Sequence, residues 1–125
     1  MNSIKVYYKI FIWSLVIAYL CFAPSDDFKK VNISIPHFDK VVHFGMFFIL
    51  GIFITVIKHI KSSRFNSLWL PVLAIIYGGA IELIQLLYIY KREGDLIDWL
   101  ADIIGLFIGI WIFSFIPNRL RKLLA

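Results

Sequence analysis

The chain contains four long apolar runs separated by short polar or proline-containing segments. These runs predict helices at about residues 6–23, 41–57, 68–90 and 96–116. A transmembrane helix needs roughly 17–25 residues, and the runs reach that length once their interfacial ends are counted. Short connections make consecutive helices antiparallel neighbours. The pattern therefore predicts an all-α integral membrane protein, a four-helix antiparallel bundle that forms a single domain over residues 1–125.

Acids and glycines share one face of the last predicted helix. At about 100° per residue, one arc of roughly 80° holds Asp95, Asp98, Asp102, Gly105 and Gly109. Glycines four residues apart let a neighbouring helix approach closely, and acids in a membrane segment face the protein interior. We therefore expect this face to point into the bundle, with the two glycines as packing positions.

Two other predicted helices bring polar residues to the same end of the bundle. In the third, Gly78, Glu82 and Gln85 share a face, with Gly78 as a packing position. Glu82 lies about 12 Å from the helix end, and a carboxylate at that depth indicates function. At the start of the second, Asp39 and His43 are one turn apart. Antiparallel threading predicts one polar pocket, formed by Asp39, Lys40, His43, Glu82, Gln85, Arg92, Asp95, Asp98 and Asp102.

Composition and charge agree with a membrane protein. Hydrophobic residues make up 61% of the chain and charged residues only 17%, whereas soluble domains are about half apolar and a quarter charged. The 13 Lys and Arg residues occur in short clusters between apolar runs, which is typical of helix anchoring and not of a nucleic-acid surface. Eight of them lie on the side of the N-terminus. This bias predicts that both termini are cytoplasmic and that the polar pocket is extracytoplasmic.

The first apolar run has a second interpretation, as a cleaved signal peptide. The letters "CFA" place small residues before a cleavage point, and "AYLC" resembles a weak lipoprotein box. Pro24 would follow that cut directly, which is a poor context for cleavage. An uncleaved first helix is therefore favoured. The single cysteine, Cys21, excludes an internal disulfide.

The chemistry of the predicted pocket leaves alternatives open. An oxygen-rich site with one imidazole suits Mg²⁺, Mn²⁺ or Ca²⁺. The ligand spacing matches no metal signature, and the chain has no P-loop, HExxH or serine-nucleophile elbow. We therefore predict no metal and no cofactor. Mutual pairing that holds the helices in register is the alternative role, favoured for Asp39, Arg92 and Asp95.

Three segments resemble the VanZ-like family of small bacterial membrane proteins: "DKVVHFGMFFILG" (39–51), "GGAIELIQ" (78–85) and "REGDLIDWLADIIGLFIG" (92–109). The resemblance covers about residues 37–112 and implies a multi-pass protein of the bacterial cytoplasmic membrane. The family takes its name from a member of a glycopeptide-resistance cluster that is associated with lowered susceptibility to teicoplanin. One departure is Asp102, where the family usually has Asn.

The pocket and the resemblance together predict a protein that binds or acts on a cell-envelope component. A lipid-linked envelope precursor or a lipoglycopeptide is the expected partner besides the lipid bilayer, with a link to teicoplanin-type resistance. An intramembrane enzyme is the first alternative, with Glu82 or His43 as the acid/base and Arg92 positioning a phosphate. Ion or proton translocation and a purely structural membrane subunit are the others, and the oligomeric state stays open.

Overall fold

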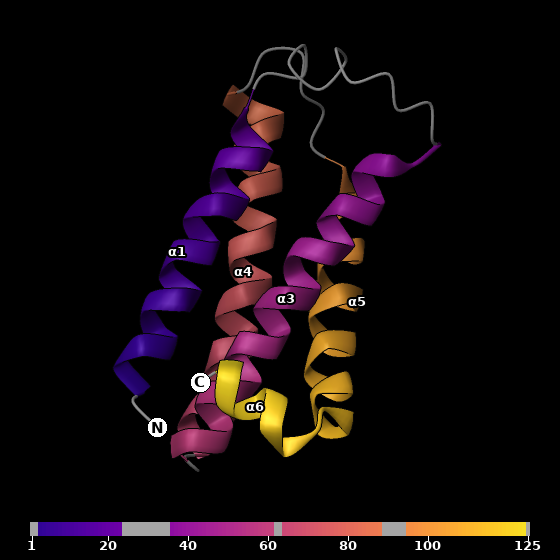
Figure 1. The fold of residues 1–125 in the computed structure, drawn as a ribbon. Coiled ribbons are helices and arrows are strands. Elements are labelled where there is room, and N and C mark those ends of the chain that lie inside the picture. Colours follow the sequence, from indigo (N-terminus) through magenta and orange to yellow (C-terminus); the bar gives the residue numbers. More distant parts are fainter. Residues whose placement is uncertain (1–2, 24–35, 62–63, 89–94, 125) are drawn as a thin grey trace.

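The computed structural model describes residues 3–23, 36–61, 64–88 and 95–124. Helical elements follow one another along the described chain, as α1 (Ser3–Phe22), α3 (Phe38–Lys61), α4 (Arg64–Tyr88), α5 (Leu96–Ile112), the 3₁₀ turn η1 (Phe113–Phe115) and α6 (Asn118–Leu124). The four long helices run in alternating directions, and both ends of the chain lie at the same end of the bundle (Figure 1). The predicted all-helical architecture is confirmed.

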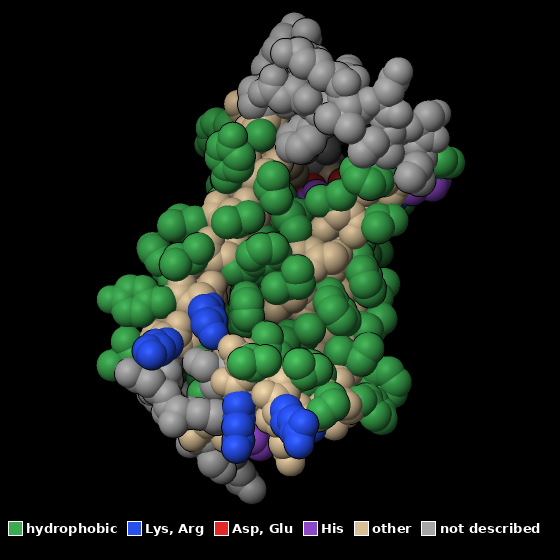
Figure 2. Space-filling model, viewed as in Figure 1, with side chains coloured by type: hydrophobic (Ala, Val, Ile, Leu, Met, Phe, Trp, Pro, Cys, Tyr) green, Lys and Arg blue, Asp and Glu red, His purple; other side chains and the backbone are tan. Residues whose placement is uncertain are grey.

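Four helices in the described ranges are long and apolar enough to cross a membrane: Ile4–Phe22, Phe38–Ile60, Leu68–Tyr88 and Leu96–Phe115. Their outward faces are largely apolar, and Figure 2 shows a surface of hydrophobic side chains with Lys and Arg gathered at one end. Acidic and histidine side chains are visible near the opposite end. This distribution is the one expected of a bundle surrounded by lipid.

The helix limits differ from those predicted from hydropathy. α3 begins at Phe38 and continues to Lys61, so polar residues at both ends of the apolar run are helical. A helix extends as far as its backbone hydrogen bonds continue, whereas hydropathy identifies only the segment of the helix that lipid surrounds. The short helix α6 was not predicted. It follows Pro117, whose carbonyl accepts from the backbone N–H groups of Leu120 and Arg121.

α3 and α5 are in backbone contact along a glycine seam, formed by Gly51, Gly105 and Gly109. A Cβ atom at Gly105 would collide with the carbonyl oxygen of Phe44, and one at Gly109 would collide with that of Phe48. In the opposite direction, a Cβ atom at Gly51 would collide with the carbonyl oxygen of Leu106. Small residues that let helix backbones touch are the usual basis of helix association in membranes.

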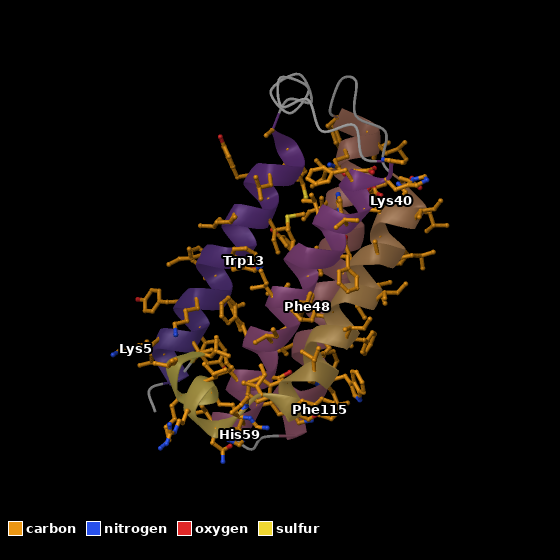
Figure 3. The ribbon with its side chains drawn as sticks, turned by 45° about the vertical axis from the view of Figure 1, so that its right-hand side comes forward. Lys5, Trp13, Lys40, Phe48, His59 and Phe115 are labelled. Atoms are coloured by element: carbon orange, nitrogen blue, oxygen red, sulfur yellow. The ribbon has the colours of Figure 1, made fainter. Side chains whose placement is uncertain are left out.

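α1 lies against α3 and α4 and is joined to them by side-chain hydrogen bonds to main-chain carbonyls. Trp13 Nε1 donates to the carbonyl of Met46 on α3 at 2.9 Å, and Figure 3 shows its position in the middle of the bundle. The Tyr77 hydroxyl on α4 donates to the carbonyl of Ser14. At the end that carries both termini, Lys9 Nζ donates to the carbonyl of Leu124 at 2.8 Å, which ties α6 to α1.

Candidate functional site

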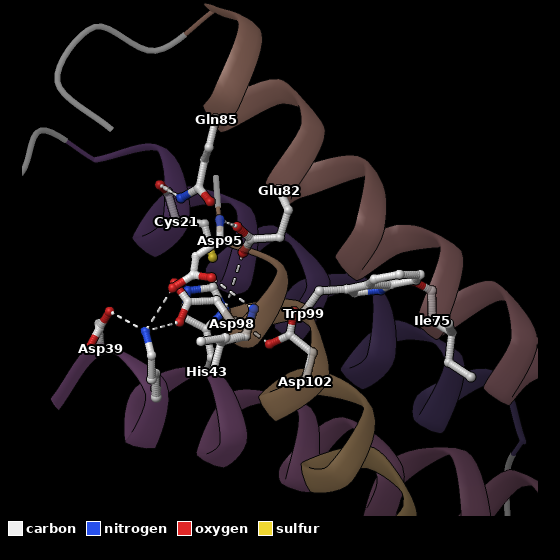
Figure 4. Close-up of polar contacts among 12 residues, drawn as sticks. Cys21, Asp39, His43, Ile75, Glu82, Gln85, Asp95, Asp98, Trp99 and Asp102 are labelled. Atoms are coloured by element: carbon white, nitrogen blue, oxygen red, sulfur yellow. Dashed lines mark hydrogen bonds and ion pairs between the residues drawn. The ribbon is translucent and has the colours of Figure 1, made fainter. Parts of the chain in front are cut away.

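The start of α3, the end of α4 and the start of α5 meet at one end of the bundle, opposite the chain termini (Figure 1). Polar side chains from these three helices gather there in a group that we call the polar cluster, in which hydrogen bonds and ion pairs connect all members except Gln85 (Figure 4). Its members in the described chain are Asp39, Lys40, His43, Glu82, Gln85, Asp95, Asp98 and Asp102. Arg92, which the sequence pattern assigns to the same pocket, lies outside the described residues.

Lys40 organises the outer part of the polar cluster. Its Nζ donates to Asp98 Oδ1 at 2.8 Å, Asp95 Oδ2 at 3.1 Å and Asp39 Oδ2 at 3.2 Å. Two of these carboxylates belong to the start of α5, so one lysine links α3 to α5. The three charge-assisted hydrogen bonds use the full donor capacity of an ammonium group.

The inner part of the polar cluster is built around His43. A hydrogen bond of 3.0 Å joins His43 Nδ1 to Asp102 Oδ1, and Glu82 Oε1 lies 3.7 Å from the same nitrogen. All three side chains are buried, and they come from α3, α5 and α4 respectively. The position of His43 follows from the helix period, because it lies about one turn below Asp39 and Lys40 on α3.

Asp95 connects the two parts through its backbone and side chain. Its Oδ1 accepts from the backbone N–H of Ile97 at 2.8 Å and so caps the N-terminus of α5, while its own backbone N–H donates to Glu82 Oε2 at 3.0 Å. The hydrogen bond from Ile97, followed by that from Lys40, lowers the pKa of the Asp95 carboxyl below its ordinary value of 3.8. Asp95 is therefore ionised at neutral pH.

Two carboxylate oxygens at the base of the polar cluster accept no hydrogen bond from the described part of the protein. They are Glu82 Oε1 and Asp102 Oδ2, and both are shielded from solvent. Each belongs to a carboxylate whose other oxygen is held in place, by Asp95 N–H or by His43. His43, Glu82 and Asp102 also each offer a metal-ligating atom, and these atoms all lie within 4.8 Å of one another.

Gln85 and Gly78 have different surroundings from the charged members. Gln85 is buried, and its Nε2 donates to the carbonyl of Cys21 at 2.7 Å, so it joins α4 to α1. Gly78 leaves room for Asp102, because a Cβ atom at position 78 would lie 3.0 Å from Asp102 Oδ2 and 3.1 Å from the Phe47 ring. The sequence did not predict that the first helix contributes to the pocket. Its contribution is the main-chain carbonyl of Cys21, and a main-chain group leaves no signal in a residue pattern.

The site and the fold define a class, a multi-pass membrane protein whose helices bury carboxylates and a histidine at one membrane end. The chain matches the VanZ/LLP1 family over residues 2–117 and belongs to it. The family resemblance seen in the sequence is thus confirmed, and the match extends through α1. The chain is also 31% identical over 116 residues to "Uncharacterized protein C11E3.10" of Schizosaccharomyces pombe, an alignment that covers 91% of this chain and 67% of the relative. No solved structure matches the chain.

Proposed function

We propose that the polar cluster binds the polar headgroup of a lipid-linked cell-envelope component at the extracytoplasmic side of a bacterial cytoplasmic membrane. The observation that carries this proposal is a gradient of exposure from the membrane end inward. Side-chain exposure falls from 60% at Asp39 and 38% at Asp95 to 10% at Asp98 and 2% at Asp102. A headgroup can therefore meet exposed carboxylates first and reach buried ones through them.

The distribution of basic residues supports the proposed orientation. The ends of α1, α3 and α4 nearest the termini, together with the segment after α5, hold eight of the 13 Lys and Arg residues. Basic residues favour the cytoplasmic side, so both termini are assigned to the cytoplasm and the polar cluster to the other face. The position of both chain ends at one end of the bundle is compatible with this assignment (Figure 1).

The charge of the polar cluster favours a cationic group, or a phosphate that arrives with a cation. In its described part, five carboxylates face one lysine, which is already shared among three of them. A bare anion would be repelled at this site. A lipoglycopeptide of the teicoplanin type carries an acyl chain beside its polar part, so it can meet both the surrounding lipid and the polar cluster. This fit is the basis for including glycopeptide resistance in the proposal.

An intramembrane enzyme that acts on a lipid-linked envelope substrate is the second candidate. It is favoured by the hydrogen bond between His43 and Asp102 and by Glu82 Oε1, which accepts no hydrogen bond from the described residues and lies 3.7 Å from the same imidazole. A histidine oriented by a carboxylate, next to a second buried carboxylate, has the groups that general acid/base chemistry requires. Under this candidate, Glu82 or His43 exchanges the proton.

The residues below the polar cluster argue against a translocation path. The buried side chains on α3 below His43 are apolar, and Met46, Leu50 and Ile54 belong to one core with Leu106 of α5. An ion or proton pathway needs polar groups or water through the full membrane thickness. The described interior offers such groups only in the half near the start of α5.

The binding proposal is tested with the Glu82→Gln variant, which keeps the size of the side chain and removes its charge. The purified chain in nanodiscs is titrated with two probes, a fluorescent lipid-linked cell-wall precursor and teicoplanin, and susceptibility to teicoplanin is measured in a bacterial host. We expect at least one of the two probes to bind Glu82→Gln at least ten times more weakly than it binds the unmodified chain, because a charge-assisted contact is lost. Turnover of the precursor is measured in the same samples.

Thr55→Val is the matched control, since it removes a polar group from the far half of α3, where Thr55 Oγ1 donates to the carbonyl of Gly51 in the same helix. It should bind both probes as the unmodified chain does. Turnover that disappears in Glu82→Gln would favour the enzyme over the binding protein. Unchanged binding and susceptibility in Glu82→Gln, at normal expression, would contradict the proposal.

A further inference from the structure

The base of the polar cluster brings three metal-ligating groups together from three different helices. His43 Nδ1 lies 3.0 Å from Asp102 Oδ1 and 3.7 Å from Glu82 Oε1. Ions such as Zn²⁺ and Mn²⁺ bind nitrogen and oxygen at about 2.0–2.2 Å, so neighbouring ligand atoms in tetrahedral or octahedral coordination are about 3.0–3.5 Å apart. The two separations from His43 Nδ1 are thus close to the edges of a coordination sphere, and all three ligand atoms lie within 4.8 Å of one another.

A second observation points to a cation independently of this clustering. Glu82 Oε1 and Asp102 Oδ2 are buried, and neither accepts a hydrogen bond from the described residues. Buried carboxylate oxygens are normally paired, because desolvation without compensation destabilises the charged form. In each carboxylate the other oxygen is already held by a protein donor, Asp95 N–H for Glu82 and His43 for Asp102. A cation bound by Glu82 Oε1 and by both oxygens of the Asp102 carboxylate would pair the two oxygens that protein donors leave free.

We propose that His43, Glu82 and Asp102 bind a divalent transition-metal ion, Zn²⁺ or Mn²⁺. One imidazole nitrogen with two carboxylates combines a borderline ligand with hard ones, a set that suits these two ions better than Ca²⁺ or Mg²⁺. With three protein ligands, the metal keeps at least one coordination position for water or another ligand. Binding displaces the proton that His43 Nδ1 and Asp102 Oδ1 share.

The surroundings of this triad fit a metal centre. The backbone N–H of Asp95 fixes the orientation of the Glu82 carboxylate, as outer hydrogen bonds do for metal ligands. Gly78 leaves space against Asp102 Oδ2, because any Cβ atom there would lie 3.0 Å from that oxygen. Asp39 and Asp95, at the outer end of the polar cluster, keep solvent-exposed carboxylates. The sequence predicted no metal, since the three ligands are distant along the chain and only helix packing brings them together.

The metal site goes beyond the proposed headgroup binding, and its test requires no envelope ligand. The full chain is purified, stripped with a chelator, reconstituted in nanodiscs and titrated with Zn²⁺ alone and Mn²⁺ alone by calorimetry, with bound metal counted by elemental analysis. We expect one equivalent per chain, and at least tenfold weaker binding in His43→Ala and in Glu82→Gln. His59→Ala is the matched control, because His59 is exposed at the opposite end of α3 (Figure 3). It should bind as the unmodified chain does.

A measurement on the unmodified chain keeps the proposal falsifiable if a variant does not fold. When Co²⁺ replaces Zn²⁺, the protein should show the visible absorption of a four- or five-coordinate site. With Mn²⁺ bound, electron paramagnetic resonance should show coordination by nitrogen. Absence of binding by the unmodified chain would overturn the proposal. Equal affinities in His43→Ala, Glu82→Gln and the unmodified chain would do the same, as would loss of binding in His59→Ala. If the unmodified chain binds metal but neither envelope probe, the metal site is supported and only the proposed headgroup binding is contradicted.

Discussion

The interface between α3 and α5 has two halves that are held together differently. In one half, the glycine seam brings the two backbones into contact, with no side chain between Gly105 and the carbonyl of Phe44 or between Gly109 and that of Phe48. In the other half, charged side chains cross the gap, with Lys40 Nζ 2.8 Å from Asp98 Oδ1. The first half relies on dispersion and shape, the second on charge.

The difference indicates that helix packing alone does not explain the buried charges. The glycine seam already brings α3 and α5 together by the contacts that usually drive association in lipid. Buried ion pairs add little to stability, because desolvation offsets most of their attraction. Asp102, Asp98 and Glu82 are therefore costly where a packing solution exists beside them, which favours a binding role over a structural one. Substitutions in each half separate these two contributions.

The largest effect is expected in the glycine seam. Gly105→Ala or Gly109→Ala places a Cβ atom against a carbonyl oxygen of α3, and a backbone atom cannot rotate away as a side chain can. The helices must then separate over part of their length. We expect a loss of about 3 kcal/mol in the free energy of unfolding, at the upper end of the usual overpacking cost. An SDS titration followed by tryptophan fluorescence measures it.

Gly45→Ala is the control for this prediction. Gly45 lies on α3 like Gly51, but a Cβ atom there would have no neighbour within 4 Å. Its replacement should not destabilise the chain and should raise the free energy of unfolding by up to about 1 kcal/mol, because alanine is the better helix former. Equal losses in Gly45→Ala and Gly109→Ala would mean that the seam does not determine the distance between the helices.

The glycine seam also shows which features of the fold a residue pattern contains. Asp98, Asp102, Gly105 and Gly109 repeat at helical spacing, so their common face follows from the spacing alone. Hydropathy likewise predicts the four spans, because lipid requires long apolar helices. Both predictions use only the sequence of a single helix and need no information on how helices pack together.

Pairing between helices could not be predicted in the same way. That Lys40 reaches three carboxylates, or that His43 meets Asp102 at 3.0 Å, depends on the rotation and vertical offset of α3 relative to α5. Residue spacing within a helix contains neither quantity. The role of Asp95 as the cap of α5 was also missed. The residue spacing places Asp95 on the same face as Asp98 and Asp102, but the helix begins only at Leu96.

A smaller loss in the free energy of unfolding is expected when Lys40 is replaced in the charged half of the interface. Lys40→Met keeps the aliphatic stem and removes the ammonium that lies 2.8 Å from the buried Asp98 Oδ1. Leaving a buried polar group without its partner destabilises by about 1–3 kcal/mol, and because Lys40 is partly exposed we expect a loss of about 2 kcal/mol. The same SDS titration measures the loss.

Lys58→Met is the matched control on the same helix. Lys58 is exposed at the other end of α3, and no ion pair joins it to an acid in the described ranges. Its replacement should leave the midpoint of the titration nearly unchanged. If Lys58→Met and Lys40→Met destabilise equally, the loss at position 40 reflects membrane anchoring and not pairing across the interface.

The smallest effect is expected at Asp95, where the cap of α5 and the contact with Lys40 are separable. Asn caps helices about as well as Asp, so Asp95→Asn still accepts the hydrogen bond from the Ile97 N–H and loses only the charge, whereas Asp95→Ala loses both. Both variants should be destabilised less than Lys40→Met, with Asp95→Ala the less stable of the two. The same SDS titration ranks the three variants.

Acid provides the second measurement at Asp95. The pKa of Asp95 is lowered in the folded chain, so the stabilisation from its charge is complete above the ordinary value of 3.8 and is lost as the pH falls through the lower folded value. The difference in thermal midpoint between the unmodified chain and Asp95→Asn should therefore be constant above about pH 5 and disappear in stronger acid. A difference that persists at the lowest pH would assign the effect to capping geometry, and the charged half of the interface would then end at Asp98.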